Sequence, residues 1–440
     1  LATFVDLAGD TKPELLTGNS AWAIDWKSGD PPTVTLSPLW KDVAGVGGDG
    51  WPAVADLDGN GTPEVVLVAW PEIHVLDGAT GKLWCGVDPS GAACENDDSK
   101  RTQPIPVPGG NLGGPAVIAD FDGDGRPEFG LSAGTSFRLF DLNRPGEVIV
   151  KPKFDPPPVS GAIFTRWSLP IQDNSSATNS ASAFDFDFDG VPEVLTQDEC
   201  FTRVLDGRTG ALRLELANSS SAIHEYPLAL DVDGDDETEL ITVANFSDAP
   251  LAAKCAADHP GWKARRGVFV YRSDAGAWPT AGALWTTHTF HVTNADAVGN
   301  VPISEQAHWK LPALNNFRRG LQSGLPANAP DLDVSLAAAL DGCPETMTLQ
   351  ATVHNAGALG VPAGVEVGFH AGADADAPLL GVVATMVALA PGATTTLTWP
   401  LSPPDPGVPV YSAVVDPGDA IDECREDNNG APLLGAACPP

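Results

Sequence analysis

Basic residues, tyrosine and methionine are scarce in this chain, and long apolar runs are missing. Lysine and arginine together number 24 against 58 aspartates and glutamates, so the formal net charge is −34. This charge repels phosphate backbones and anionic lipid surfaces, which excludes nucleic acid from the expected partners. No run of about 18 apolar residues is present, so we predict no membrane span.

Signatures of common hydrolases and of zinc or redox modules are also missing. The sequence has no G-x-S-x-G, phosphate-binding loop or H-E-x-x-H motif, and its seven cysteines form no C-x-x-C pair. Scattered cysteines favour structural disulfides, which suit an extracellular or cell-surface protein. The chain opens at Leu1 in a strand-like run without a charged or apolar leader, so we expect a mature or trimmed product.

Glycine and proline are abundant instead. Glycine occurs 46 times and proline 41 times, about a fifth of the chain. Both residues interrupt helices, so we predict many short strands joined by turns and almost no helix. The expected fold class is therefore all-β. A hydrophobic content of 43% is enough for a large core and argues against a disordered chain.

An acidic loop recurs five times in the first 245 residues, each time between two apolar runs. The copies read VDLAGDTKPELL, ADLDGNGTPEVV, ADFDGDGRPEFG, FDFDFDGVPEVL and LDVDGDDETELI, and they begin their acidic runs at Asp6, Asp56, Asp120, Asp185 and Asp231. Spacings of 46 to 65 residues fit the four-stranded blade of a β-propeller. Three copies carry another aspartate 21 positions later, where we expect a hairpin, at Asp77, Asp141 and Asp206.

Alternate positions of the four intact loops carry oxygen ligands, in the spacing 1, 3, 5, 7 and 9 that suits a hard divalent cation. Position 7 offers its main-chain carbonyl and the other positions offer side chains. The predicted ligands are Asp56, Asp58, Asn60, Thr62 and Glu64; Asp120, Asp122, Asp124, Arg126 and Glu128; Asp185, Asp187, Asp189, Val191 and Glu193; and Asp231, Asp233, Asp235, Glu237 and Glu239. An all-oxygen set favours calcium over zinc or magnesium, so about four Ca²⁺ ions are expected.

The copies differ where the loop must turn sharply. Position 6 is glycine in three intact loops and Asp236 in the fifth copy. In the first copy Thr11 stands at position 6 and Ala8 replaces the third-position carboxylate, so metal binding there is left open. A single loop of this kind is also compatible with a solvated turn, whereas four copies in register favour metal sites.

The acidic loops stop before residue 330, and short alternating strands follow. Residues 331–430 have the length and turn signals of an immunoglobulin-like β-sandwich, and 431–440 form a tail. Cysteines near the two ends of this domain are expected to close it, which leaves one over. The candidate pairs are Cys343–Cys424 here, with Cys438 unassigned, and Cys85–Cys94 and Cys200–Cys255 in the first domain.

The D-x-D-x-D-G-x-x-E loops, each followed by an apolar strand, resemble the FG-GAP and VCBS repeats of integrin-α-like β-propellers. The second domain resembles the CARDB type of bacterial adhesion-related immunoglobulin-like domain, through PDL at 330–332, VHNAG at 353–357 and ECREDNN at 423–429. The resemblance implies a secreted or surface-displayed protein whose calcium ions rigidify blade edges. We expect a propeller over 1–325, with five blades visible as repeats and six or seven in all.

Two classes of function are compatible with these features. The first is a calcium-binding adhesion or scaffold protein that binds an extracellular polysaccharide or surface protein through insertions at 86–113 and 143–180. The alternative is a carbohydrate-active enzyme, a polysaccharide lyase or hydrolase on a calcium-stabilised propeller.

Histidines supply further candidate chemistry. His288, His291 and His308, with Glu305, offer a transition-metal site, and His224 beside Glu225 offers an acid and a base. Sequence proximity fixes neither geometry, and ordinary polar residues of strands or loops fit the same pattern. The catalytic residues are unknown, and we expect a binder rather than a catalyst.

Overall fold

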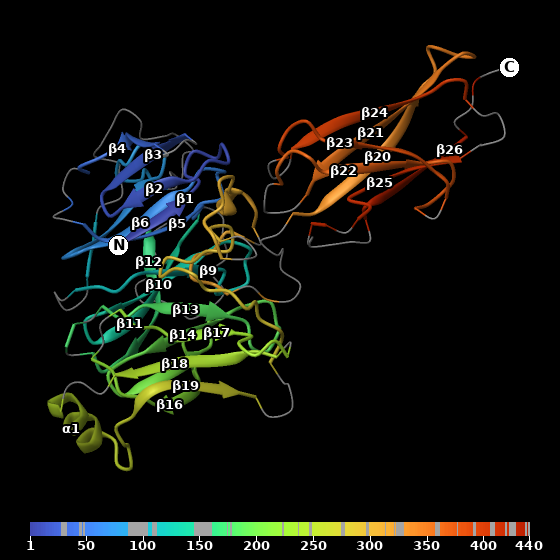
Figure 1. The fold of residues 1–440 in the computed structure, drawn as a ribbon. Helices are drawn as coiled ribbons and strands as arrows, with labels where there is room; N and C mark the ends of the chain where they lie inside the picture. Colours follow the sequence, from blue (N-terminus) through green and yellow to red (C-terminus); the bar gives the residue numbers. More distant parts are fainter. Residues whose placement is uncertain are drawn as a thin grey trace. The chain divides into compact units, whose positions relative to one another are not determined.

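The computed structural model of the chain describes residues 1–27, 33–43, 46, 49–86, 104–107, 112–144, 161–173, 175–176, 178–221, 224–235, 237–245, 249–273, 278–295, 299–312, 314–320, 322, 330–356, 361–375, 377–389, 393–404, 410–418, 420–421, 428–435 and 438. Contacts divide the chain into two compact units, Leu1–Asn294 with Ala307–Leu325, and Ala295–Gln306 with Pro326–Pro440. Both are built from antiparallel strands, so the predicted all-β class is confirmed (Figure 1). The helix α1 (Ala249–Asp258) is short, and no helix among the described residues is long and apolar enough to cross a membrane.

Five antiparallel sheets follow one another along the first unit, and each opens with the two strands that flank an acidic loop. Their strands are β1 (Ala2–Val5), β2 (Glu14–Thr17), β3 (Ser20–Lys27) and β4 (Thr33–Trp40); β5 (Trp51–Ala55), β6 (Glu64–Ala69), β7 (Glu72–Asp77) and β8 (Ile105–Pro106); β9 (Val117–Ala119), β10 (Glu128–Ala133), β11 (Ser136–Leu142) and β12 (Ile163–Pro170); β13 (Ala181–Phe184), β14 (Glu193–Gln197), β15 (Phe201–Leu205) and β16 (Leu212–Ala217); and β17 (Leu228–Leu230), β18 (Glu239–Asn245) and β19 (Arg266–Arg272).

Successive sheets contact each other through their first strands. β1 contacts β5, β5 contacts β9, β9 contacts β13, and β13 contacts β17. Val54, Ile118 and Ala183 of these strands are buried, and they belong to the apolar cores of the unit. A closed propeller of six or seven blades is not present among the described residues, since five sheets are formed and the fifth has three strands.

Residues 307–322, which come after β19 in the sequence, form an irregular segment that we call the strap. It lies along the first strands of several sheets. Nε2 of His308 forms a hydrogen bond of 2.9 Å with the carbonyl of Val54 in β5. Phe317 exchanges two main-chain hydrogen bonds, of 2.8 and 2.9 Å, with Ile118 in β9, and the next strap residue accepts a bond from β13. The repeat spacing did not predict this segment because it carries no acidic loop.

Both insertions predicted from the sequence contain a strand that completes a sheet. The range 86–113 includes β8 and the range 143–180 includes β12. Trp167 in β12 donates its indole N–H to the carbonyl of Gly207 at 2.8 Å, and Trp40 at the end of β4 donates likewise to Gly78. These two tryptophans join their sheets to the hairpin turns of other sheets, so Trp167 gives the described part of the 143–180 insertion a structural role.

The predicted hairpins form in two repeats and not in the third. Asp77 and Asp206 each accept hydrogen bonds from the main chain and hydroxyl of a threonine three residues later, at 2.7 to 2.9 Å. Asp141 instead lies inside β11 and pairs with Arg166. An equal offset in sequence therefore marks a turn only where the Thr-Gly of the turn follows.

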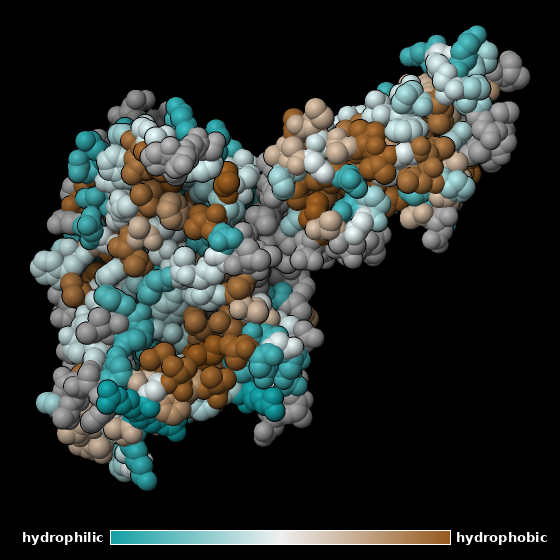
Figure 2. Space-filling view, viewed as in Figure 1, coloured by the Kyte–Doolittle hydropathy of each residue, from teal (hydrophilic) through white to brown (hydrophobic). Residues whose placement is uncertain are grey.

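A disulfide joins Cys200 to Cys255, as predicted, and links the turn before β15 to α1. The predicted pairing of Cys85 with Cys94 cannot be placed, because Cys94 lies outside the described residues. Figure 2 shows apolar surface over β18 and β19, where Val243, Val268 and Val270 are exposed. β19 is also the edge strand of its sheet.

The second unit is a sandwich of two antiparallel sheets, in keeping with an immunoglobulin-like domain. Alternate residues of its long strand β21, from Met347 to Val353, are buried in the core. The strands are β20 (Leu332–Ala339), β21 (Met347–Asn355) and β24 (Thr394–Leu401) in one sheet, and β23 (Leu379–Ala384), β22 (Glu366–His370), β25 (Val410–Val415) and β26 (Gly430–Leu434) in the other.

The disulfide of this unit differs from the predicted one. Cys343 pairs with Cys438, not with Cys424, and Cys424 lies outside the described residues. Spacing suggested that a cysteine near residue 430 closes the domain. The last strand, β26, ends at Leu434, so the covalent closure comes from the tail that follows it.

Candidate metal centre

Each acidic loop joins the first two strands of a sheet in the same way. The first strand ends one residue before the leading aspartate, and the second strand begins at the glutamate of position 9. Those two flanking residues are paired across the sheet in every copy, at Val5–Glu14, Ala55–Glu64, Ala119–Glu128, Phe184–Glu193 and Leu230–Glu239. The last pair of each ladder therefore fixes both ends of the loop.

Hydrogen bonds from the loop's own main chain hold the leading aspartate and the final glutamate. In the second loop the carboxylate of Asp56 accepts the N–H groups of Gly59 and Gly61 at 2.7 and 2.8 Å. Oε2 of Glu64 accepts the N–H of Leu57 at 2.8 Å. The glutamate bond recurs in all five copies, at 2.7 to 3.0 Å. The loop is therefore held in shape by its own hydrogen bonds.

Three carboxylates converge in each of the four intact loops. Their ligand oxygens lie within 4.8 Å of one another, and the groups are Asp56, Asp58 and Glu64; Asp120, Asp122 and Glu128; Asp185, Asp187 and Glu193; and Asp231, Asp233 and Glu239. These are positions 1, 3 and 9 of the predicted ligand set. Such a set of hard oxygen donors suits Ca²⁺, whose remaining ligands are commonly carbonyls and water.

Position 5 also bonds the loop's own main chain. Its side-chain oxygen accepts the N–H of position 7 at 2.7 to 2.9 Å in all four loops, through Asn60, Asp124, Asp189 and Asp235. Position 5 therefore caps the turn, and its role as a cation ligand stays a prediction. Position 7, at Thr62, Arg126, Val191 and Glu237, takes part as the donor of that bond.

Burial raises the pKa of the position-9 glutamate in the second, third and fourth loops. The pKa of Glu64 lies well above its usual value because the group is desolvated, and repulsion from Asp58 adds to the effect. Desolvation likewise raises the pKa of Glu128, and it raises that of Glu193 to about 7. A bound cation would remove this cost, since an adjacent positive charge favours the ionised carboxylate.

Arginines already lie against some loops. Nη1 of Arg166 is 2.7 Å from Asp122 in the third loop and 2.6 Å from Asp141. Arg126 of the third loop donates to the main-chain carbonyl of Asp58 in the second loop at 2.7 Å, which links neighbouring sheets. These cations offset part of the acidic charge, and the sequence pattern alone did not identify them.

The first loop keeps the shape of the others without their carboxylate set. Asp6 and Glu14 form the same main-chain hydrogen bonds as the intact copies, although Ala8 stands at position 3. Nζ of Lys310, on the strap, donates to the carbonyl of Gly9 at 2.7 Å. A tethered ammonium group therefore lies on the one loop that lacks a converging group among the described residues.

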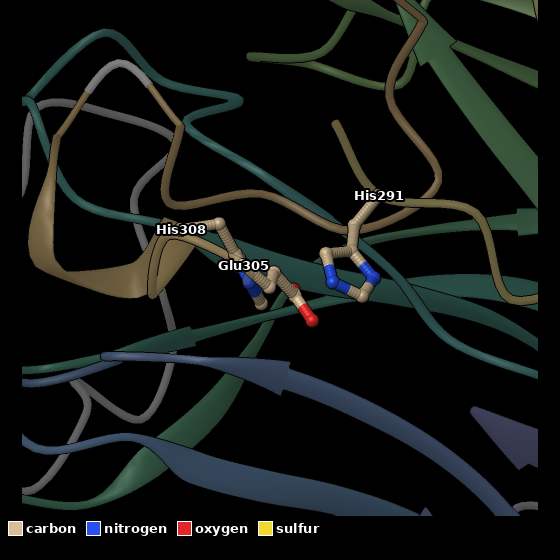
Figure 3. Close-up of side chains that lie close together, drawn as sticks. All are labelled: His291, Glu305 and His308. Carbon is tan, nitrogen blue, oxygen red and sulfur yellow. The ribbon is translucent and has the colours of Figure 1, made fainter. Parts of the chain in front are cut away.

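Among the histidines, His291, Glu305 and His308 come together, and their ligand atoms lie within 4.8 Å of one another (Figure 3). His288 is not in this group, and its Nε2 lies 2.9 Å from the carbonyl of His224. Nor are His224 and Glu225 brought together as acid and base, because the ring of His224 packs against Trp51 and Glu225 hydrogen-bonds to Ser220 and Asn245.

Residues 329–432 match the CARDB family, and this range overlaps the predicted domain at 331–430. No curated protein matches the chain. Among solved structures, the biofilm matrix protein Bap1 of V. cholerae is 18% identical, with a TM-score of 0.42, and the match covers 73% of this chain and 76% of Bap1. The CARDB domain of the PF1109 protein from Pyrococcus furiosus, solved in complex with di-metal ions, is 26% identical, with a TM-score of 0.22, over 26% of this chain and 94% of that one. An Agrocybe aegerita lectin that recognises non-reducing terminal N-acetylglucosamine is 12% identical, with a TM-score of 0.34, over 90% of this chain and 84% of the lectin.

Proposed function

We propose that the protein is an extracellular adhesion or scaffold protein whose first unit is stabilised by about four Ca²⁺ ions. The observation that carries this proposal is the repeated convergence of three carboxylates at the same junction of four sheets. Each group contains a buried glutamate whose charge needs compensation. The CARDB match supports the adhesion-related role, and the disulfides support an oxidising location. We retain the FG-GAP or VCBS identity of the repeats as part of the same proposal.

The calcium sites serve the fold rather than a reaction in this proposal. Two of the three carboxylates in a loop also bond the loop's own main chain, so a cation bound there fixes the junction between two strands. Calcium held by protein oxygens in this way has few positions left for a substrate. The ions would therefore keep the sheets rigid while another surface makes contact with a partner.

One described face has the composition of such a contact surface. Arg266, Val268, Val270 and Arg272 alternate along β19 and are all exposed, on the edge strand of its sheet. Apolar surface between two arginines is unusual in a chain with a net charge of −34. The partner that this face suits is an acidic extracellular polysaccharide, whose carboxylates the guanidinium groups would bind.

Two variants of the chain test the calcium sites. Glu64→Gln keeps the size of the side chain but removes one charged ligand, so we expect one Ca²⁺ fewer per chain by calorimetric titration. Glu72→Gln, on the next strand of the same sheet and half exposed, is the matched control and should retain all ions. Equal calcium stoichiometry in both variants would count against the loops as the sites.

The contact surface is tested with polyuronate and neutral glucan beads in saturating calcium. Retention on the polyuronate should fall at least about tenfold for Arg266→Ala combined with Arg272→Ala, since two charge-assisted contacts are lost. Calcium stoichiometry should stay unchanged. Unchanged retention would reject this face. New ultraviolet absorbance of soluble polyuronate during incubation would favour the lyase alternative.

A further inference from the structure

A second kind of metal-binding chemistry is formed by residues that are not part of the acidic loops. His291, Glu305 and His308 are each 0% exposed, and one ligand atom of each lies within 4.8 Å of the other two. Figure 3 shows the carboxylate of Glu305 between the two imidazole rings. Glu305 precedes the strap by two residues, and His308 opens the 3₁₀ segment η3 (His308–Lys310) within it.

The hydrogen bond of His308 selects the tautomer that a metal requires. Its Nε2 lies 2.9 Å from the carbonyl of Val54, which can only accept, so Nε2 carries the proton. Nδ1 then holds a free lone pair, and it has no hydrogen-bond partner among the described residues. Metal-binding histidines usually show this pattern, in which a main-chain carbonyl fixes one nitrogen and the metal takes the other.

His291 is oriented in a similar way. Its ring is hydrogen-bonded to the main chain of Thr289, and Phe317 of the strap stacks on it with ring centroids 5.1 Å apart. The rings of His291 and His308 are 4.3 Å apart and tilted by 41°. The protein therefore holds both imidazole rings in place before a ligand enters.

We propose that His291, Glu305 and His308 form a transition-metal site, with Zn²⁺ as the expected ion. Two imidazoles and one carboxylate are a donor set of zinc proteins, whereas Ca²⁺ prefers oxygen alone. Complete burial of all three side chains leaves no route for a substrate, so the ion is structural and a water or further protein atom completes its coordination. It fixes the strap at the point where His308 meets β5. This site does not depend on calcium in the acidic loops.

The test is a titration of the metal-stripped full chain with Co²⁺ and then Zn²⁺, in excess Ca²⁺ so that the acidic loops are saturated. One Co²⁺ per chain should bind with the visible absorption of a tetrahedral nitrogen and oxygen site, and Zn²⁺ should displace it. Absence of a stoichiometric site in the folded wild-type protein would overturn the proposal, because the group would then be a buried hydrogen-bonded cluster without a metal.

Two conservative variants locate the site. His308→Gln keeps an N–H for the Val54 carbonyl but removes the ligand nitrogen, and Glu305→Gln keeps the size of the side chain but removes the charge. Each should weaken Co²⁺ binding at least about 100-fold, more than is typical when an outer partner of a ligand is lost. His74→Gln, a buried histidine of β7 outside the cluster, should bind as the wild type does. If either cluster variant folds by circular dichroism and retains wild-type affinity, the proposal is wrong.

Discussion

The two units of this chain are both antiparallel β-structures, yet different interactions stabilise them. In the first unit a buried glutamate opens the second strand of all five sheets, so charge lies beside the core. In the second unit the corresponding positions of a long strand such as β21 are apolar, and a disulfide between Cys343 and Cys438 closes the domain. Both units have apolar cores and a disulfide, and the first unit has in addition buried carboxylates whose charge requires compensation.

Calcium removal should produce the largest difference in thermal stability between the two units. A ligand at about 100 times its dissociation constant stabilises the native state by about 2.7 kcal/mol per site, so four sites supply roughly 11 kcal/mol. We expect EDTA to lower the melting temperature of the first unit by on the order of 20 °C and to leave the second unit unchanged. Scanning calorimetry of the full chain measures both transitions. Equal shifts in the two transitions would remove the proposed difference.

Loss of the disulfide between Cys343 and Cys438 should lower the stability of the second unit and not that of the first. Replacing Cys343 and Cys438 together by serine removes a link that spans 95 residues, which typically costs about 4 kcal/mol. The second unit should melt earlier at every calcium concentration, and the first should not respond. A calcium-dependent effect of this double variant would show that the stability of the two units is coupled.

The pH dependence of the metal-free protein should also differ between the units. Burial raises the pKa of Glu14 and of Glu193 to about 7 from 4.5. Because the folded pKa exceeds the unfolded one, the stability from the protonated form is complete below about pH 4.5 and is lost as pH rises through about 7. In EDTA the first unit should melt earlier at about pH 7.5 than at about pH 5, relative to the second. A rise of its melting temperature over this range would contradict the account.

The smallest expected effect comes from the turn of the first loop. Thr11 has a φ of 69°, where the second loop has Gly61 at 82°. A left-handed conformation costs a residue with a Cβ about 1 kcal/mol, so Thr11→Gly should stabilise the first unit by about that amount without adding a calcium site. Gly61→Thr should destabilise it similarly, since nothing lies within 4 Å of an added Cβ there. Denaturant titration of both variants gives the comparison.

Local features of this fold were predictable because they repeat. The acidic loops and the strands on either side of them follow from residue type and spacing, whereas Cys200–Cys255 was one candidate pair that the structure confirms. The converging groups coincide with positions 1, 3 and 9 of the predicted ligands, and position 5 is seen to bond the turn, so its ligand role stays a prediction. A short side chain two residues before an N–H has both options, and spacing does not decide between them.

Features without a repeat were missed. The strap has no acidic loop, and its contacts with β5 and β9 join residues more than a hundred positions apart. The closed propeller was inferred by extending the repeats, while the described chain continues into the strap after β19. Cys438 was left over because the length of the tail says nothing about where it returns. His291, Glu305 and His308 were noticed as residue types, but only the fold brings them together.

The central claim is that the four intact loops hold calcium and the first loop does not. Long-wavelength anomalous scattering from crystals grown in calcium tests it directly, because each ion is located beside its ligands. We predict four peaks, between the carboxylates of positions 1, 3 and 9 of the second to fifth loops, and none at Asp6 and Glu14, where Lys310 lies. No peaks at the intact loops, or zinc in place of calcium there, would contradict it.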